Sequence, residues 1–219
     1  MISYRKLAMR VLGHSPVSAV KTARRSTAKR AAALALTAAL VVGMTLPAFA
    51  DTWYIDDGDI SISAGTNGNN VTQGSTTKEN DTDTVITNRE STASSNTVTI
   101  DAGEGETVNV TLENVNIDTS KTGEAAVSVT GSGNTNIELN GNNTLTSGSG
   151  YAGLEHNKTD DSGTLTIQDE KNDDDTAKGS ASDTTGSLTA TGGYHSAGIG
   201  GSDKQGGQVT ITGGEIIAN

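Results

Sequence analysis

The chain has 219 residues and no cysteine, so disulfide bonds are excluded as a source of stability. The first 50 positions hold eight of the 15 Lys and Arg residues and none of the 26 Asp and Glu residues, which leaves a net charge of −19 on the other 169 residues. A surface this acidic repels nucleic acid and anionic lipid, and both are excluded as expected partners.

Residues 1–50 have the composition of a signal peptide. Basic residues precede the apolar run AAALALTAALVVGM at 31–44, and the small-residue cleavage signal TLPAFA ends at Ala50. The apolar run is shorter than the roughly 20 residues of a membrane-spanning helix, which makes a retained membrane anchor the weaker alternative. We therefore expect a mature chain that begins at Asp51, is secreted or held at the cell surface, and makes no membrane contact after cleavage.

Short strands separated by turns are predicted along the mature part. The first covers 51–62, the second lies around 85–86, and the third covers 97–100. The segment 63–83, rich in Asn, Gly, Thr and Ser, is predicted to be a solvated insertion. The charged segment 170–185, which has no large apolar residue, is predicted to be a second insertion.

A repeat follows, in which strands of alternating apolar and polar residues recur in the same order. Leu112, Leu139 and Ile167 are separated by 27 and 28 residues, and Ile211 follows Ile167 after 44, an excess of 16 that equals the second insertion. Three strands and three turns per 28 residues predict an all-β fold, a right-handed three-sided parallel β-helix that is incomplete at the C-terminus. We also expect further coils or domains beyond Asn219.

The repeat predicts which side chains stack on one another in successive coils. The two internal rows are expected to be Val110, Ile137, Leu165 and Val209, and Leu112, Leu139, Ile167 and Ile211. On the outside, the same strands present polar rows, of which one is expected to be Asn109, Asn136, Thr164 and Gln208. Together the polar rows are expected to form one flat face.

Several segments of the mature part occur in a recognisable order. They are WYIDDGDISI, TVTIDAGEGETVNVTLENVNI, NTNIELNGNNTLTSG, AGLEHN, GTLTI, GSLTATGG, SAGIGG and VTITGG, and they cover 53–219. This succession resembles the β-helical carbohydrate-binding domain of exported Gram-positive bacterial surface proteins, a non-catalytic solenoid similar in fold to pectate lyases. The resemblance implies a right-handed parallel β-helix that binds cellulose-like or acidic plant polysaccharide, with calcium sites in some members.

Two tyrosines precede the third strand of adjacent coils, so the repeat places Tyr151 and Tyr194 on neighbouring turns. Aromatic rings at such a corner can form a platform for sugar rings. His195, Glu155 and His156 lie close by in the sequence and are candidate hydrogen-bond partners of a bound sugar. The alternative is that the tyrosines only cover apolar residues at the corner.

Acidic residues form the candidate calcium sites, because Ca²⁺ prefers hard oxygen ligands. Smaller groups lie at 56–59 and 81–83. The largest group is Asp169, Glu170, Asp173, Asp174 and Asp175. None of these groups has the spacing of a known calcium loop, and the alternative is a solvated charged loop. An acidic polysaccharide would need a bridging cation to approach this acidic chain.

Three functions remain open at this point. The first is a carbohydrate-binding module that holds polysaccharide with the aid of calcium, and the alternative is a structural stalk or adhesin solenoid of a cell-surface protein. A polysaccharide lyase or hydrolase is less favoured. A lyase needs a basic residue beside bound calcium, and no Lys or Arg falls in a predicted strand of the repeat. Glu113 and Glu138 lie on diagonal rows, unlike the carboxylate pair of a hydrolase.

Overall fold

The computed structural model describes residues 51–159, 162–169, 186–202 and 205–219. Its elements are β-strands apart from one short 3-10 turn, η1 (Ile55–Asp57), so the predicted all-β class is confirmed. None of the elements in these ranges is a helix long and apolar enough to cross a bilayer. The predicted signal peptide, 1–50, and the predicted insertion at 170–185 lie outside the described residues.

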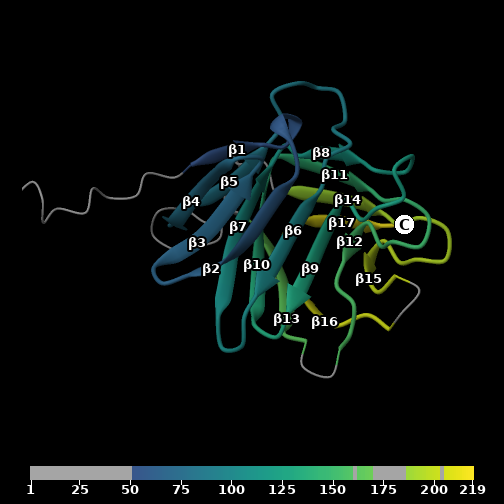
Figure 1. The fold of residues 1–219 in the computed structure, drawn as a ribbon. Coiled ribbons are helices and arrows are strands. Elements are labelled where there is room, and N and C mark those ends of the chain that lie inside the picture. Colours follow the sequence, from purple (N-terminus) through teal and green to yellow (C-terminus); the bar gives the residue numbers. More distant parts are fainter. Residues whose placement is uncertain (1–50, 160–161, 170–185, 203–204) are drawn as a thin grey trace, which may run out of the picture. The chain divides into compact units, whose positions relative to one another are not determined.

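The strands form three sheets, which Figure 1 shows with their labels. The six-stranded sheet has the order β1 (Thr52–Tyr54), β5 (Thr84–Thr87), β7 (Thr107–Glu113), β10 (Asn134–Asn140), β13 (Thr164–Asp169) and β16 (Gln208–Ile211). The four-stranded sheet has the order β17 (Glu215–Ala218), β14 (Ser187–Thr191), β11 (Asn142–Thr146) and β8 (Asn116–Asp118). The seven-stranded sheet has the order β15 (Ile199–Gly200), β12 (Leu154–Glu155), β9 (Val127–Gly131), β6 (Val98–Ala102), β2 (Ile60–Gly65), β3 (Gly68–Gln73) and β4 (Thr76–Asp81).

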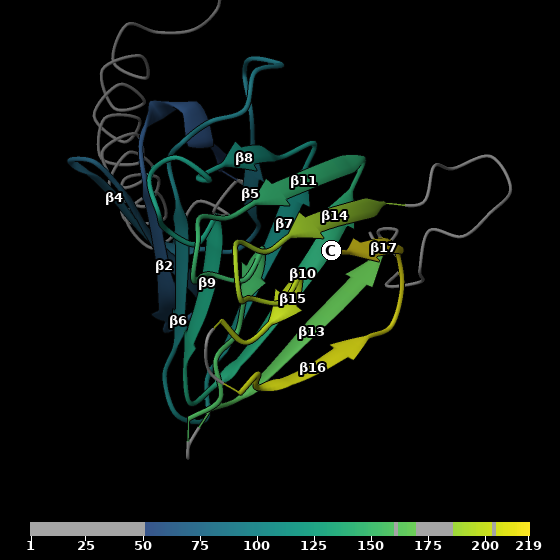
Figure 2. The same cartoon turned by 90° about the vertical axis from the view of Figure 1, so that its right-hand side faces the viewer.

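From β7 onward the chain passes through the three sheets in a fixed order. Each strand of the six-stranded sheet is followed by one of the four-stranded sheet and then by one of the seven-stranded sheet. Figure 2 shows β8, β11, β14 and β17 side by side in one sheet and β10, β13 and β16 in another. Paired strands in this part are parallel, as predicted, and Ile117 pairs with Leu145, 28 residues later.

The core is built from the apolar half of the alternating strands. In β7, the side chains of Val108, Val110 and Leu112 are buried, and β10 adds Ile137 and Leu139. Successive side chains of a strand point to opposite sides of the sheet, so these residues share one face. Each fully buried Val, Leu or Ile side chain stabilises the fold by about 1.5–3 kcal/mol.

The predicted register is confirmed between β7 and β10 and is wrong between β10 and β13. Ile137 pairs with Ile167 and not with Leu165, and Leu139 therefore stands opposite Asp169. A shift of two residues keeps every side chain on the same face, so the alternation cannot distinguish the two registers. Ile167 follows Ile137 by 30 residues, whereas Ile137 follows Val110 by 27, so this repeat is three residues longer than the one before it.

The polar face of the six-stranded sheet follows the observed register. The row that begins with Asn109 and Asn136 continues with Thr166, and not with Thr164 as predicted. Neighbouring polar side chains bind one another: Asn136 Nδ2 donates to Asn109 Oδ1 at 2.9 Å. In the next row, Gln168 Nε2 donates to Glu138 Oε1 at 2.8 Å. This face is therefore hydrogen-bonded across strands.

The segment 63–83 forms a hairpin, so the prediction of a solvated loop is wrong. β3 pairs with β2 and with β4, and both pairings are antiparallel. Gly74, between β3 and β4, has a φ of +59°, which glycine adopts without steric cost in a two-residue hairpin turn. Buried Asn69 Nδ2 donates to Thr84 Oγ1 at 2.9 Å and to Asn109 O at 2.6 Å. Polar side chains thus replace the apolar contacts whose absence suggested a loop.

The predicted first strand, 51–62, is divided between two sheets. β1 belongs to the six-stranded sheet and β2 to the seven-stranded sheet, so the chain has to bend between them. The bend is made by η1 and by Gly58, which has a φ of +137°. Ile55 is fully buried and anchors the bend in the core.

Candidate functional site

Tyr151 and Tyr194 lie on turns that are bound to each other. Gly150 N donates to Tyr194 O at 3.1 Å, and Gly193 N donates to Tyr151 O at 2.9 Å. The tyrosines are 38% and 75% exposed, respectively. A residue with three quarters of its surface in solvent covers little of the core, so the role of a lid over apolar residues does not fit Tyr194.

His195 extends the exposed corner beside Tyr194. Its backbone has a φ of +64°, the left-handed conformation that few residues other than glycine adopt. The centroids of the Tyr194 and His195 rings are 3.9 Å apart and the ring planes meet at 67°. Both side chains are exposed. The turn thus presents two adjacent rings, set edge to face, to the solvent.

Glu155 and His156, the other two predicted sugar-binding residues, lie inside the fold. The Glu155 carboxylate accepts hydrogen bonds from the hydroxyl groups of Ser128 and Ser202. Both ring nitrogens of His156 face backbone carbonyl oxygens. Nε2 lies 3.0 Å from Gly163 O, and Nδ1 lies 3.4 Å from Val129 O in β9. Both side chains are buried. Their polar atoms therefore bind the protein itself, and neither side chain reaches the exposed corner.

Of the five predicted calcium ligands, only Asp169 lies within the residues that the structure describes. Asp169 Oδ1 accepts a hydrogen bond from Gly186 N at 2.8 Å, at the start of the next strand. The other four predicted ligands, Glu170, Asp173, Asp174 and Asp175, lie outside the described residues. In the part of the chain that the structure describes, no three His, Asp or Glu side chains converge on a position for a metal ion.

The acidic group at 56–59 is divided among separate partners. Asp56 Oδ2 accepts from the backbone N of Arg89 at 2.6 Å, and Asp57 forms an ion pair with the Arg89 guanidinium at 2.8 Å. Asp59 Oδ1 accepts from Thr97 N at 2.8 Å. Two of these carboxylates thus bind Arg89 and the third binds Thr97, and the contacts hold them to the fold rather than around a common cation site.

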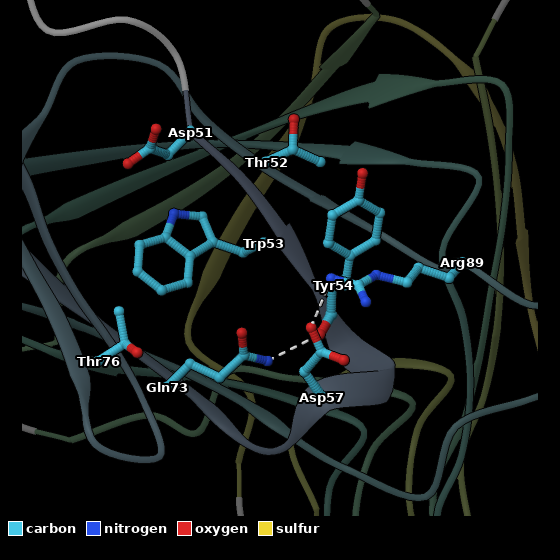
Figure 3. A pocket seen from close by; sticks show the side chains of 8 residues that line it. All are labelled: Asp51, Thr52, Trp53, Tyr54, Asp57, Gln73, Thr76 and Arg89. Carbon is cyan, nitrogen blue, oxygen red and sulfur yellow. Dashed lines mark hydrogen bonds and ion pairs between the residues drawn. The ribbon is translucent and has the colours of Figure 1, made fainter.

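A pocket of about 280 Å³ lies beside the first strand (Figure 3). It is lined by Asp51, Thr52, Trp53, Tyr54, Asp57, Gln73, Thr76 and Arg89. Trp53 is buried, and the Arg89 guanidinium covers the Tyr54 ring with its central carbon 4.1 Å from the ring centroid. Both aromatic rings are therefore occupied by the protein. The aromatic pair at positions 53 and 54 was the sequence signal for this pocket.

Comparison of the chain with known protein families, with curated proteins and with solved structures gave no match. The candidate sites therefore have to be distinguished by their own chemistry. Tyr151 and Tyr194 keep ring surface in solvent, whereas the rings of the pocket are buried or covered. The exposed corner is the better candidate for recognition of a flat, hydroxyl-rich ligand.

Proposed function

We propose that the mature chain is an exported, non-catalytic module that binds polysaccharide of the cellulose-like or acidic plant type. The proposed scaffold is a right-handed three-sided parallel β-helix of about 28 residues per coil. One observation carries the proposal: two tyrosines that are 38% and 75% exposed lie on turns joined by backbone hydrogen bonds. The resemblance of the sequence to carbohydrate-binding domains of exported surface proteins supports the same function.

The corner of Tyr151, Tyr194 and His195 is suited to sugar rings for a physical reason. A sugar ring has one face of C–H groups, which packs on the electron-rich face of an aromatic ring. Because the two tyrosine turns are directly hydrogen-bonded, their backbones are held in place before the ligand arrives. A preorganised site loses less conformational entropy on binding.

The charge of the chain sets the class of glycan that it can bind unaided. With a net charge of −19 on residues 51–219, a neutral β-glucan is accepted without an ionic cost, whereas an acidic glycan requires a bridging cation. We propose calcium for that role, with Asp169 as the one predicted ligand within the described residues. Asp169 Oδ1 also accepts a hydrogen bond from Gly186 N at 2.8 Å, which fixes this carboxylate at the start of β14.

Binding should be measured by affinity electrophoresis against neutral and acidic plant polysaccharides, each with and without a calcium chelator. The wild-type chain is compared with Tyr194→Ala, which removes the ring, and with Tyr194→Phe, which keeps it. Loss of one stacking contact is expected to weaken binding about 3- to 10-fold for Tyr194→Ala and little for Tyr194→Phe. Glu104→Ala, at another exposed turn, is the matched control. Failure of the wild-type chain to bind any glycan would refute the proposal.

The second candidate is a structural stalk or adhesin solenoid, extended by further coils on β16 and β17. A specific observation favours it: Ile211 in β16, an edge strand of the six-stranded sheet, is 52% exposed although it pairs with the fully buried Ile167. An added coil would cover this side chain and pair the open strand edges. This function predicts no glycan affinity for the isolated solenoid, so the same electrophoresis separates the two candidates.

A further inference from the structure

Asp51, the first residue of the expected mature chain, is bound to the fold through all of its polar groups. Its backbone N is 3.4 Å from Asp81 Oδ1, and its backbone O accepts a hydrogen bond from Val85 N at 3.3 Å. Its carboxylate forms an ion pair with Lys78. The peptide bond expected to be cleaved, between Ala50 and Asp51, therefore contains the very amide that faces the Asp81 carboxylate.

Asp81 is a buried acid, with 1% of its surface exposed. Its Oδ2 atom accepts hydrogen bonds from Trp53 Nε1 and from Thr84 Oγ1, both at 3.1 Å. Its Oδ1 atom faces the backbone N of Asp51 and, at 3.7 Å, the ammonium group of Lys78. A buried carboxylate is costly unless it is hydrogen-bonded and paired with a positive charge. The two donors to Oδ2 are uncharged. A positive charge that balances the carboxylate therefore has to lie near Oδ1.

Among the residues that the structure describes, two carboxylates and one ammonium group meet at this position while residue 50 is attached. The Asp51 and Asp81 carboxylates share one ammonium group, that of Lys78. Hydrolysis of the Ala50–Asp51 bond by a signal peptidase consumes one water molecule, and leaves a carboxylate on Ala50 and an α-ammonium group on Asp51. The new positive charge arises on the atom that lies 3.4 Å from Asp81 Oδ1. After cleavage, two carboxylates face two ammonium groups.

We propose that signal-peptide cleavage creates a structural ion pair between the α-ammonium group of Asp51 and the buried carboxylate of Asp81, so that processing itself stabilises the exported fold. The pair joins the residue before β1 to the last residue of β4, and these strands belong to different sheets. It rests on the proposed export of the chain but not on sugar binding. It also gives Trp53, which donates to the same carboxylate, a fixed position at the start of the mature chain.

The ion pair has a pH dependence whose sign follows from the chemistry. An α-amino group has an ordinary pKa of about 7.7–8.0, and a neighbouring carboxylate raises the pKa in the folded chain. A raised pKa means that the added stability is fully present below about pH 7.7 and is lost as the pH rises through the folded value. Among the described residues, the charged groups that face the amine are the carboxylates of Asp81 and Asp51 and the ammonium group of Lys78.

The test uses the full-length precursor, secreted and processed by a bacterial host, with the new N-terminus mapped by mass spectrometry. A second precursor carries two glycines inserted between Ala50 and Asp51, which keeps the net charge but moves the α-ammonium group by roughly 7 Å of chain. We expect the insertion to lower the melting temperature by roughly 3–10 °C near pH 7, and this difference to shrink at about pH 10.

Two substitutions, each made in both the normal and the glycine-extended precursor, show whether Asp81 is the partner. Asp81→Asn should abolish the difference between the normal and the glycine-extended chains, whereas Asp83→Asn, an equal charge change at an exposed position, should preserve it. If Asp81→Asn does not fold, the test is the pH dependence of the melting-temperature difference between the normal and the glycine-extended chains. The proposal is wrong if the mapped N-terminus is not Asp51, if both chains melt together at pH 7, or if their difference persists at high pH. Glycan binding is not measured, so failure of the sugar-binding proposal leaves this result unaffected.

Discussion

Ile137, Ile167 and Ile211 offer a direct test of how burial stabilises the six-stranded sheet. The three isoleucines stand in one row, because Ile137 pairs with Ile167 and Ile167 with Ile211. The first two are fully buried, whereas Ile211 is 52% exposed. The substitutions Ile137→Ala and Ile211→Ala thus remove the same atoms from the same row and differ only in burial.

The expected magnitudes follow from the atoms removed. Replacing isoleucine by alanine deletes three carbon groups, which at about 0.8 kcal/mol each gives roughly 2.4 kcal/mol of lost transfer free energy for Ile137. The cavity left in the core raises the loss to about 3–4 kcal/mol. For Ile211, half of the surface is already in solvent and no enclosed cavity forms, so the expected loss is about 1 kcal/mol.

The free energy of unfolding should be measured by urea denaturation of residues 51–219 and of the two variants. Both variants should keep the urea dependence of the wild type and shift only the midpoint, by about three times as much for Ile137→Ala as for Ile211→Ala. Equal losses in the two variants would contradict the observed register and burial, because they would mean that both positions have the same surroundings.

Two other substitutions test the turns. Gly131→Ala places a Cβ atom against the carbonyl oxygen of Ala102 at a φ of +89°, whereas Gly105→Ala meets open space at +73°. Urea denaturation should show a loss of about 1–2 kcal/mol for Gly105→Ala and clearly more for Gly131→Ala, and equal losses would count against the close approach. Hydrogen bonds from the Ser120 hydroxyl and amide, together with nearby Lys121, lower the pKa of Asp118 below its usual 3.8. Its contribution is present above pH 3.8 and is lost as the pH falls through the lowered value. Asp118→Asn should therefore cost less than about 1 kcal/mol at pH 7, and the cost should decrease as the pH falls below 3.8; a cost that does not change on acidification would exclude this cause.

Sequence reasoning located most strands because alternation is a local property. Val108, Val110 and Leu112 alternate with polar residues over a single strand, and that alone places them on the buried face of β7. The strands within 63–83 were not predicted because they bury polar groups. Asn69 is buried and donates hydrogen bonds to Thr84 and to Asn109 O, and a search for apolar residues does not detect such contacts.

The candidate site was predictable only in part. The repeat placed Tyr151 and Tyr194 on adjacent turns, but their exposed fractions depend on the turn conformation, including the left-handed backbone of His195. Glu155 and His156 lie close to Tyr151 in sequence and yet are buried, because their side chains meet Ser202 and Gly163 from later turns. Closeness along the chain therefore did not mean a shared surface.

By itself, the sequence determined that residues 51–219 are built largely from short alternating strands, parallel in the repeat that begins at β7, and contain no disulfide, because alternation, turn residues and cysteine content are properties of the chain alone. The tertiary structure alone decided the pairing of Ile137 with Ile167 and the meeting of Asp51 with Asp81. Both depend on turn lengths and on contacts between residues about 30 positions apart, and shifts of two residues leave the alternating pattern unchanged.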